Sequence, residues 1–124
     1  RVQVIKGWHD KKGELHEKIY NVVLSDGRKE NWKGKVKTVG NTVDINDATY
    51  SNSIGDPELA VVWEDPDFNK DELAFYYARV LEIPTPRWTT SYTHYWKTDY
   101  PNDVPLVIQE RAYTSPIWYT PAGK

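Results

Sequence analysis

"LAFYYARVLEI" (residues 73–83) carries the strongest β-strand signal in the chain and decides the fold. Aromatic and β-branched residues dominate it, and its apolar positions follow no helical repeat. Pro84, Pro86 and then Arg87-Trp88 come directly after it. Because proline fixes φ and lacks an N–H, we predict that the strand ends before Pro84 and that the chain leaves the sheet there. Residues 84–103 are then expected to be irregular.

Short β-prone runs bounded by turn residues occur on both sides of this strand. They cover residues 2–9, 15–24, 41–45, 48–54, 58–65, 105–113 and 115–120. The loop Asp10–Gly13 between the first two runs is typical of a β-hairpin. Residues 58–64 and 70–76 could begin a helix, but neither keeps helical spacing for three turns. The sequence therefore predicts an all-β fold, an antiparallel β-sandwich or open barrel of about seven or eight short strands with long proline-rich loops.

The composition is that of one small β-domain spanning residues 1–124. Hydrophobic residues make up only 39%, but there are six Trp, nine Tyr and two Phe, which bury large areas while keeping a polar tip. The net charge of −2 gives no electrostatic basis for binding nucleic acid. Residues 1–40 hold ten Lys/Arg against five acids, so the charge is uneven and could help the chain dock on another domain.

Several classes of chemistry find no support in the residues. The chain has no cysteine, so it has neither a disulfide framework nor a thiolate nucleophile. No apolar stretch is long enough to span a membrane. The chain starts at Arg1 and contains no Met, which leads us to expect a piece of a longer protein. No serine nucleophile motif or phosphate-binding loop is visible, so we assign no catalytic residue.

Two groups of residues are weak candidates for a metal site. If the hairpin turn pairs residue 9 with residue 14, then His9, Glu14 and His16 share one face, and this is a legitimate zinc-ligand set. Exposed polar residues on the wet face of a hairpin explain the same pattern. Asp65 and Asp67 begin a run of alternating oxygen side chains like that of a calcium loop, although the glycine and the final acid of such a loop are missing. A turn stabilised by aspartate side chains is the alternative.

Charged and aromatic residues near the prolines are candidates for binding or for an interface. Arg87-Trp88 places a hydrogen-bond donor fork beside a stacking plane, a pairing that suits anionic or cyclic ligands. Local salt bridges and caps would account for the same residues. The complete set of candidates is Glu82, Arg87, Trp88, Arg111 and Trp118.

Long, unusual strings spread over nearly the whole chain resemble one known family. They include "VIKGW" (4–8), "HEKIYNV" (16–22), "GNTVD" (40–44), "ATYSNSIG" (48–55), "VWEDPDF" (62–68), "AFYYARVLEIPTPRW" (74–88) and "QERAYTSPIWYTP" (109–121). In this order they are similar to the C-terminal end of the family catalogued as domain of unknown function 3604. Residues 28–39 and 89–103 are its least typical parts.

The resemblance implies a large, mostly bacterial and often exported protein, and hence a periplasmic or secreted location. Its N-terminal part resembles the polymerase-and-histidinol-phosphatase type of metallohydrolase, in which a divalent metal activates water. That ligand set has no match here, so the resemblance implies no cofactor in this fragment and carries over no catalytic residue. It implies instead that the partner of this β-domain is the N-terminal catalytic domain of the same chain.

Two functions of different kinds follow from these observations. The first is a non-catalytic C-terminal β-domain that packs against or borders a metal-dependent hydrolase domain. The second is an independent ligand-binding module of the carbohydrate type, based on the surplus of Trp and Tyr. An exposed apolar patch of more than about 300 Å² around Pro84–Trp88, with no concave pocket, would favour the first. A groove floored by parallel aromatic rings would favour the second.

Overall fold

The structure is a computed structural model that describes residues 1–100 and 102–122. These residues form five β-strands and one α-helix. The elements are β1 (Val2–His9), β2 (Leu15–Val23), β3 (Ala74–Pro86), α1 (Trp88–Trp96), β4 (Val107–Tyr113) and β5 (Ile117–Tyr119). The nine-residue helix α1 is too short to cross a membrane, and no other described segment forms a helix with the length and hydropathy of a membrane span.

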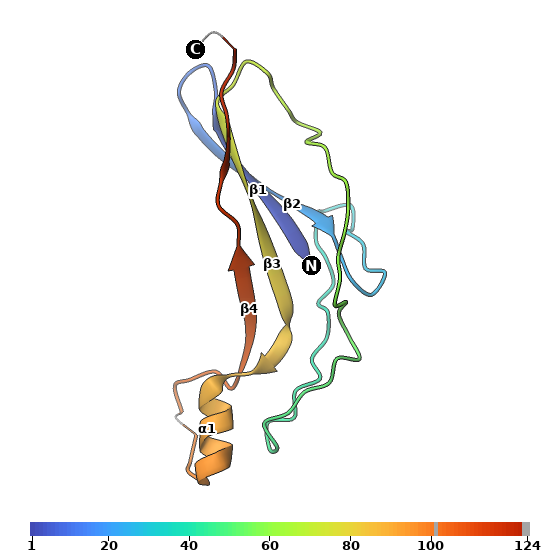
Figure 1. The fold of residues 1–124 in the computed structure, drawn as a ribbon, viewed down its shortest axis with the longest axis vertical. Helices are drawn as coiled ribbons and strands as arrows, with labels where there is room; N and C mark the ends of the chain where they lie inside the picture. The colour runs from blue at the N-terminus through green and yellow to red at the C-terminus, as the bar shows by residue number, and fades with distance from the viewer. Residues whose placement is uncertain (101, 123–124) are drawn as a thin grey trace. The chain divides into compact units, whose positions relative to one another are not determined.

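The strands form one open sheet in the order β2-β1-β3-β4, with β5 also paired to β3 (Figure 1). β1 runs antiparallel to both β2 and β3, so it has a hydrogen-bonded neighbour on each side. β5 is also antiparallel to β3, along Ala74–Tyr76. The all-β class and the hairpin at residues 10–13 are confirmed, because β1 and β2 flank that turn.

The strand count of seven or eight was wrong, since the described residues contain five strands in a single open sheet. The expected strands at 41–45 and 48–54 are reduced to one isolated bridge, between Asp44 and Thr49. The Asp44 carboxylate accepts hydrogen bonds from the backbone N–H groups of Asn46 and Asp47, and such local bonds compete with a sheet ladder. Residues 58–65 are also outside any strand.

The prediction that this strand ends before Pro84 was wrong. β3 continues through Pro84 to Pro86. A φ near −65° is compatible with extended backbone, so proline removes a donor without forcing the chain out of a strand. Pairing with β1 stops at Val80, which lies opposite Val2. Beyond Val80 the strand no longer has β1 as a neighbour. Proline, which has no backbone N–H, is tolerated at strand positions where no neighbouring strand requires that hydrogen bond.

The prediction that residues 84–103 are irregular was also wrong, because α1 occupies Trp88–Trp96; residue 101 lies outside the described residues. The N–H of Arg87 and the hydroxyl of Thr90 both donate to the carbonyl of Leu106, at 2.9 Å and 2.7 Å. Thr90 and Thr93 are the buried residues of the helix. The buried side of α1 is therefore polar, and the large apolar residues of the helix lie on its exposed side.

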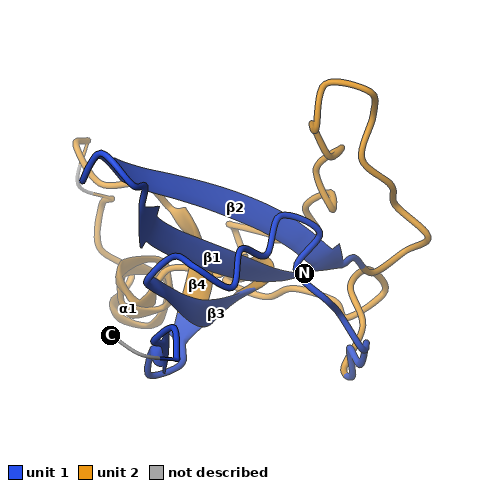
Figure 2. Ribbon diagram, turned by 90° about the horizontal axis from the view of Figure 1, so that it is seen from above, with its two compact units in different colours: residues 1–24, 58–80, 112–124 blue, residues 25–57, 81–111 orange. Residues whose placement is uncertain are grey.

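The chain divides into two compact units, coloured in Figure 2. Unit 1 consists of residues 1–24, 58–80 and 112–124, and unit 2 of residues 25–57 and 81–111. Unit 1 contains β1, β2, β5 and the first half of β3, whereas α1 belongs to unit 2.

The register of β1 assigns the side chains of unit 1 to two faces. Gly7 lies opposite Glu17 on β2 and Phe75 on β3, and Phe75 lies opposite Trp118 on β5. Since successive side chains of a strand point to opposite faces, these four residues share one face. Lys6 lies opposite Lys18 and Tyr76, and these three residues share the other face.

Gly7 allows the ring of Phe75 to lie directly against β1. A Cβ added at Gly7 would be 2.3 Å from Cζ of Phe75, far inside van der Waals contact. The glycine is therefore required by the close approach of an aromatic ring and not by a turn.

We expect Gly7→Ala to lower the free energy of unfolding by about 2 kcal/mol, the usual cost of forcing a methyl group into a packed site. Urea denaturation of both proteins measures the change. In a Phe75→Ala background the same substitution should cost much less, because the clashing ring is gone. An equal cost in both backgrounds would show that Phe75 is not the constraint.

Candidate functional site

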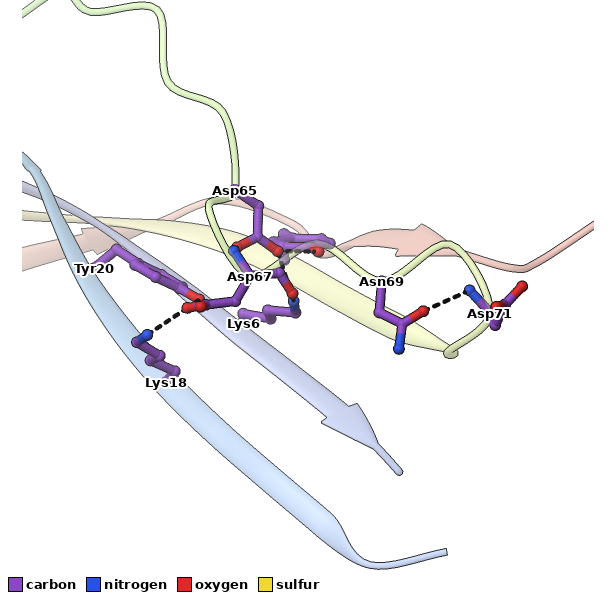
Figure 3. Close-up of polar contacts among 8 residues, drawn as sticks. Lys6, Lys18, Tyr20, Asp65, Asp67, Asn69 and Asp71 are labelled. Carbon is purple, nitrogen blue, oxygen red and sulfur yellow. Dashed lines mark hydrogen bonds and ion pairs between the residues drawn. The ribbon is translucent and has the colours of Figure 1, made fainter. Parts of the chain in front are cut away.

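A buried ion pair holds the segment around Asp65 against one face of the unit 1 sheet (Figure 3). Nζ of Lys6 donates to a carboxylate oxygen of Asp65 at 2.6 Å and to the carbonyl of Asp67 at 2.7 Å. The hydroxyl of Tyr76 donates to the same Asp65 oxygen at 2.8 Å. Only 4% of the Lys6 side chain and 7% of the Asp65 side chain are exposed. Both charges are thus compensated inside the unit.

A second, more exposed group of contacts lies beside this pair. The carboxylate of Asp67 accepts hydrogen bonds from Nζ of Lys18 and from the hydroxyl of Tyr20, the latter at 2.8 Å. In Figure 3 the Asp67 carboxylate lies between these two β2 side chains. Aromatic contacts also join this segment to the strands. The ring centroids of Trp63 and Tyr20 are 5.1 Å apart, and those of Phe68 and Tyr119 are 4.9 Å apart.

These contacts shift the pKa values of the groups involved. Burial acts to raise the pKa of Asp65, but hydrogen bonds from Lys6 and Tyr76 outweigh it and hold the pKa below its ordinary value. The hydrogen bond from Lys18, followed by that from Tyr20, lowers the pKa of Asp67. Burial, together with a bond to an aspartate, raises the pKa of both Tyr20 and Tyr76. The carboxylates are therefore ionised and the phenols neutral near pH 7, which is a structural arrangement and not an acid–base couple poised for catalysis.

The calcium-loop interpretation of this segment does not fit the geometry. Lysine ammonium groups hold the carboxylates of Asp65 and Asp67 where a cation would have to bind. The other oxygens cap turns: Asp65 accepts the N–H of Asp67 at 2.9 Å and Asn69 accepts the N–H of Asp71 at 3.0 Å. The alternative made from the sequence, aspartate-stabilised turns, describes the observed contacts.

The hairpin histidines do not share a face either. β1 pairs His9 with Leu15 and Trp8 with His16, a register one residue away from the one that would align His9, Glu14 and His16. A shift of one residue moves side chains to the opposite face. His16 instead stacks on Trp8, with 5.2 Å between ring centroids, and its Nε2 lies 3.2 Å from the carboxylate of Asp10. Across residues 1–100 and 102–122, no group of three or more His, Cys, Asp or Glu could hold a metal ion.

At the hairpin end of the unit 1 sheet there is a recess of about 520 Å³. Its lining comes from β1, β2, β3, β5 and their flanking residues: Gly7, Trp8, His9, Leu15, His16, Glu17, Leu73, Ala74, Phe75, Trp118, Tyr119 and Thr120. Trp118, a predicted binding residue, is 72% exposed and lies in this wall. The rings of Phe75 and Trp118 are 5.3 Å apart between centroids and inclined by 50°, so they form two walls at an angle and not the parallel platform expected of a carbohydrate groove.

The other predicted binding residues all lie in unit 2. Arg87 precedes α1, and its carbonyl accepts the N–H of Thr90 at 2.9 Å, so it begins the helix. Glu82 is exposed, and its carbonyl accepts a hydrogen bond from the Gln109 side chain at 2.9 Å. Arg111 is exposed on β4. Trp88 is 71% exposed at the start of α1.

The exposed side of α1 is a surface that the sequence interpretation missed. Trp88, Tyr92, Tyr95 and Trp96 are spaced i, i+4, i+7 and i+8, so they lie on one side of the helix, opposite Thr90 and Thr93. All four are exposed. The ring centroids of Tyr95 and Trp96 are 5.1 Å apart, and those of Tyr92 and Trp96 are 6.2 Å apart. We call these four residues the aromatic stripe.

The chain is thus a mostly β protein whose described residues offer an internal ion-pair cluster, an aromatic recess and an aromatic helix surface. A family model described as "Protein of unknown function (DUF3604)" matches residues 1–121, and the chain belongs to this family. The resemblance noted from the sequence is confirmed. Comparisons with curated proteins and with solved structures found no significant match.

We expect Lys6→Met to lower the free energy of unfolding by about 3 kcal/mol, because it leaves a buried carboxylate without its cation. Lys18→Met is the matched control. In the Lys18–Asp67 pair each side chain is 49% exposed, and we expect the free energy of unfolding to fall by less than about 1 kcal/mol. Chemical denaturation of both variants gives the comparison, and equal losses would contradict the importance of the buried pair.

The lowered pKa of Asp65 also predicts a pH dependence. A carboxylate whose pKa is lower in the folded state stabilises the fold above its unfolded pKa, and the contribution disappears as the pH falls through the folded pKa. The ordinary value is 3.8, so stability should decline progressively below about pH 5. Denaturation curves from pH 7 to pH 2 should show a shallower decline for Asp65→Asn than for the unmodified chain. An unchanged slope would contradict the assignment.

Proposed function

We propose that the chain is a non-catalytic β-domain that packs against a metal-dependent hydrolase domain of the same longer polypeptide, with the aromatic stripe as its contact surface. The observation that carries the proposal is the orientation of α1. A helix at the surface of a self-sufficient domain buries its apolar side, whereas α1 buries threonines and exposes four aromatic residues.

The chemistry of the stripe suits a protein–protein contact. Trp and Tyr are among the residues that contribute most to interface energies, because they combine a large apolar area with a polar tip. Arg87 lies next to Trp88 at the start of the helix and adds a donor that can satisfy a partner's carboxylate or carbonyl.

The accessible surface points in the same direction. Among the described residues only Ile5, Ala74 and Leu81 are buried hydrophobic residues. Many large hydrophobic residues outside this small core, Trp88, Tyr95 and Trp96 among them, are exposed and give a partner apolar surface to cover.

The assignment of the hydrolase activity to the partner rests on the family resemblance alone. In this proposal the metal ligands belong to the partner domain, which agrees with the pairing of Asp65 and Asp67 with Lys6 and Lys18. Its proposed role is to stabilise and border the catalytic domain. Export to the periplasm or outside the cell, and the bacterial origin, belong to the same proposal.

The test is the double substitution Trp88→Ala/Tyr95→Ala. In residues 1–124 alone it should change the free energy of unfolding by less than about 1.5 kcal/mol, because both side chains are largely exposed. In the complete gene product it should increase proteolytic cleavage between the domains and lower metal-dependent hydrolysis.

Trp32→Ala is the matched control, since Trp32 is 88% exposed and lies outside α1. It should leave both measurements unchanged. A loss of several kcal/mol in the isolated chain would instead place the stripe in the chain's own core. Indifference of the complete product to the double substitution would also overturn the proposal.

A further inference from the structure

The recess of unit 1 has the size and wall chemistry of a small-molecule site, and it is independent of the aromatic stripe on unit 2. Its volume of about 520 Å³ lies within the range of ligand pockets. Leu15 and Trp118 line it, and they are 87% and 72% exposed, so the recess is open to solvent.

The aromatic walls are positioned by the sheet and not by a loose loop. Phe75 rests on Gly7 in the adjacent strand, where no Cβ intervenes, and pairs with Trp118 in the next strand. Because the two rings are inclined by 50°, one flat ligand ring cannot stack on both. A compact, rounded group can touch both.

The charge near these rings is negative. Glu17 lies opposite Gly7 and lines the recess, and its carboxylate forms no hydrogen bond or ion pair with another described residue. The nearest lysines in the ladder are Lys6 and Lys18, and both lie on the opposite face, bound to Asp65 and Asp67. Neither lysine therefore neutralises the Glu17 carboxylate; His9, which shares its face, contacts the carbonyl of Asp10 instead.

Of the two hairpin histidines, His9 lies on the face of Gly7 and Glu17, whereas His16 stacks on Trp8 on the Lys6 face. His9 Nδ1 lies 3.2 Å from the carbonyl of Asp10, and His16 Nε2 lies 3.2 Å from its carboxylate. These contacts hold the two imidazoles within the hairpin, which leaves Glu17 as the charged group available to a ligand.

We propose that the recess binds a compact organic cation, of the trimethylammonium or alkylated amine class. Aromatic faces attract such cations through the negative potential of the ring, and a nearby carboxylate adds direct attraction. The rounded shape of a trimethylammonium group suits two inclined rings, and its methyl groups can pack on the exposed side chains of Leu15 and Trp118.

The experiment compares choline with its neutral carbon analogue, in which a tert-butyl group replaces the trimethylammonium group. Binding to residues 1–124 is measured by calorimetry and by ligand-observed NMR. We expect choline to bind in the millimolar range and the neutral analogue to bind about tenfold more weakly. Glu17→Gln should weaken choline binding about threefold to tenfold and leave the neutral analogue unaffected. Trp118→Leu, which keeps an apolar side chain but removes the ring, should weaken choline binding by a similar factor.

Glu14→Gln is the matched control, because Glu14 is exposed on the same hairpin but does not line the recess. It should leave choline binding unchanged, and circular dichroism checks the fold of every variant. Should Trp118→Leu not fold, the exposed Glu17→Gln substitution still tests the site. Equal affinity for choline and its neutral analogue, no binding of choline at tens of millimolar, or an unchanged affinity in Glu17→Gln would overturn the proposal. Binding of a methyl glycoside in place of choline would overturn it in favour of a carbohydrate site.

Discussion

The pairing of β1 with both β2 and β3 is the constraint on which the rest of unit 1 depends. Because side chains alternate along a strand, this register sends Lys6 to one face and Gly7 to the other. On the Lys6 face it creates a cation that the Asp65 segment must neutralise. On the Gly7 face it creates a gap that the Phe75 ring fills. A shift of one residue would exchange these roles and bury a lysine under Phe75.

The ion pair on the Lys6 face makes this register specific in a way that an apolar core would not. A buried pair contributes little net stability, because the cost of removing both charges from water offsets their attraction. Removing only one partner is expensive, so any alternative packing that separates Lys6 from Asp65 is strongly disfavoured. Cation–π contacts, with Nζ of Lys6 at 5.1 Å from the Trp8 ring centroid, further compensate the buried ammonium. The segment is thus held to the sheet by a contact that only one register satisfies.

The sequence was sufficient for the elements whose signals are local. The two hairpin strands and most of β3 follow from β-branched and aromatic runs interrupted by turn residues. The ends of β1 and β2 and the start of β3 lie within one residue of the predicted positions. The sequence could not predict which hairpin residues share a face. Pairing residue 9 with residue 15 or with residue 14 differs by one position, and the amino-acid composition is the same for both registers. The extension of β3 through Pro84 and Pro86 depends on where β1 begins, which is a property of the whole sheet.

The helix escaped prediction for a different reason, and that reason bears on function. Trp88, Tyr92, Tyr95 and Trp96 do follow a helical spacing, but the repeat covers only nine residues between Pro86 and Pro101 and consists of aromatic residues and threonines that favour strands. The side of α1 that carries this repeat is the exposed one. The recess on unit 1 also exposes aromatic rings, but it combines a hollow with an unpaired carboxylate, while the stripe on α1 is built from four neighbouring rings along a helix side. A hollow with one charge selects a small ligand of opposite charge, and a row of large rings on a helix offers area to a protein surface. The same surplus of Trp and Tyr can therefore serve two kinds of recognition, because the backbone beneath the rings differs.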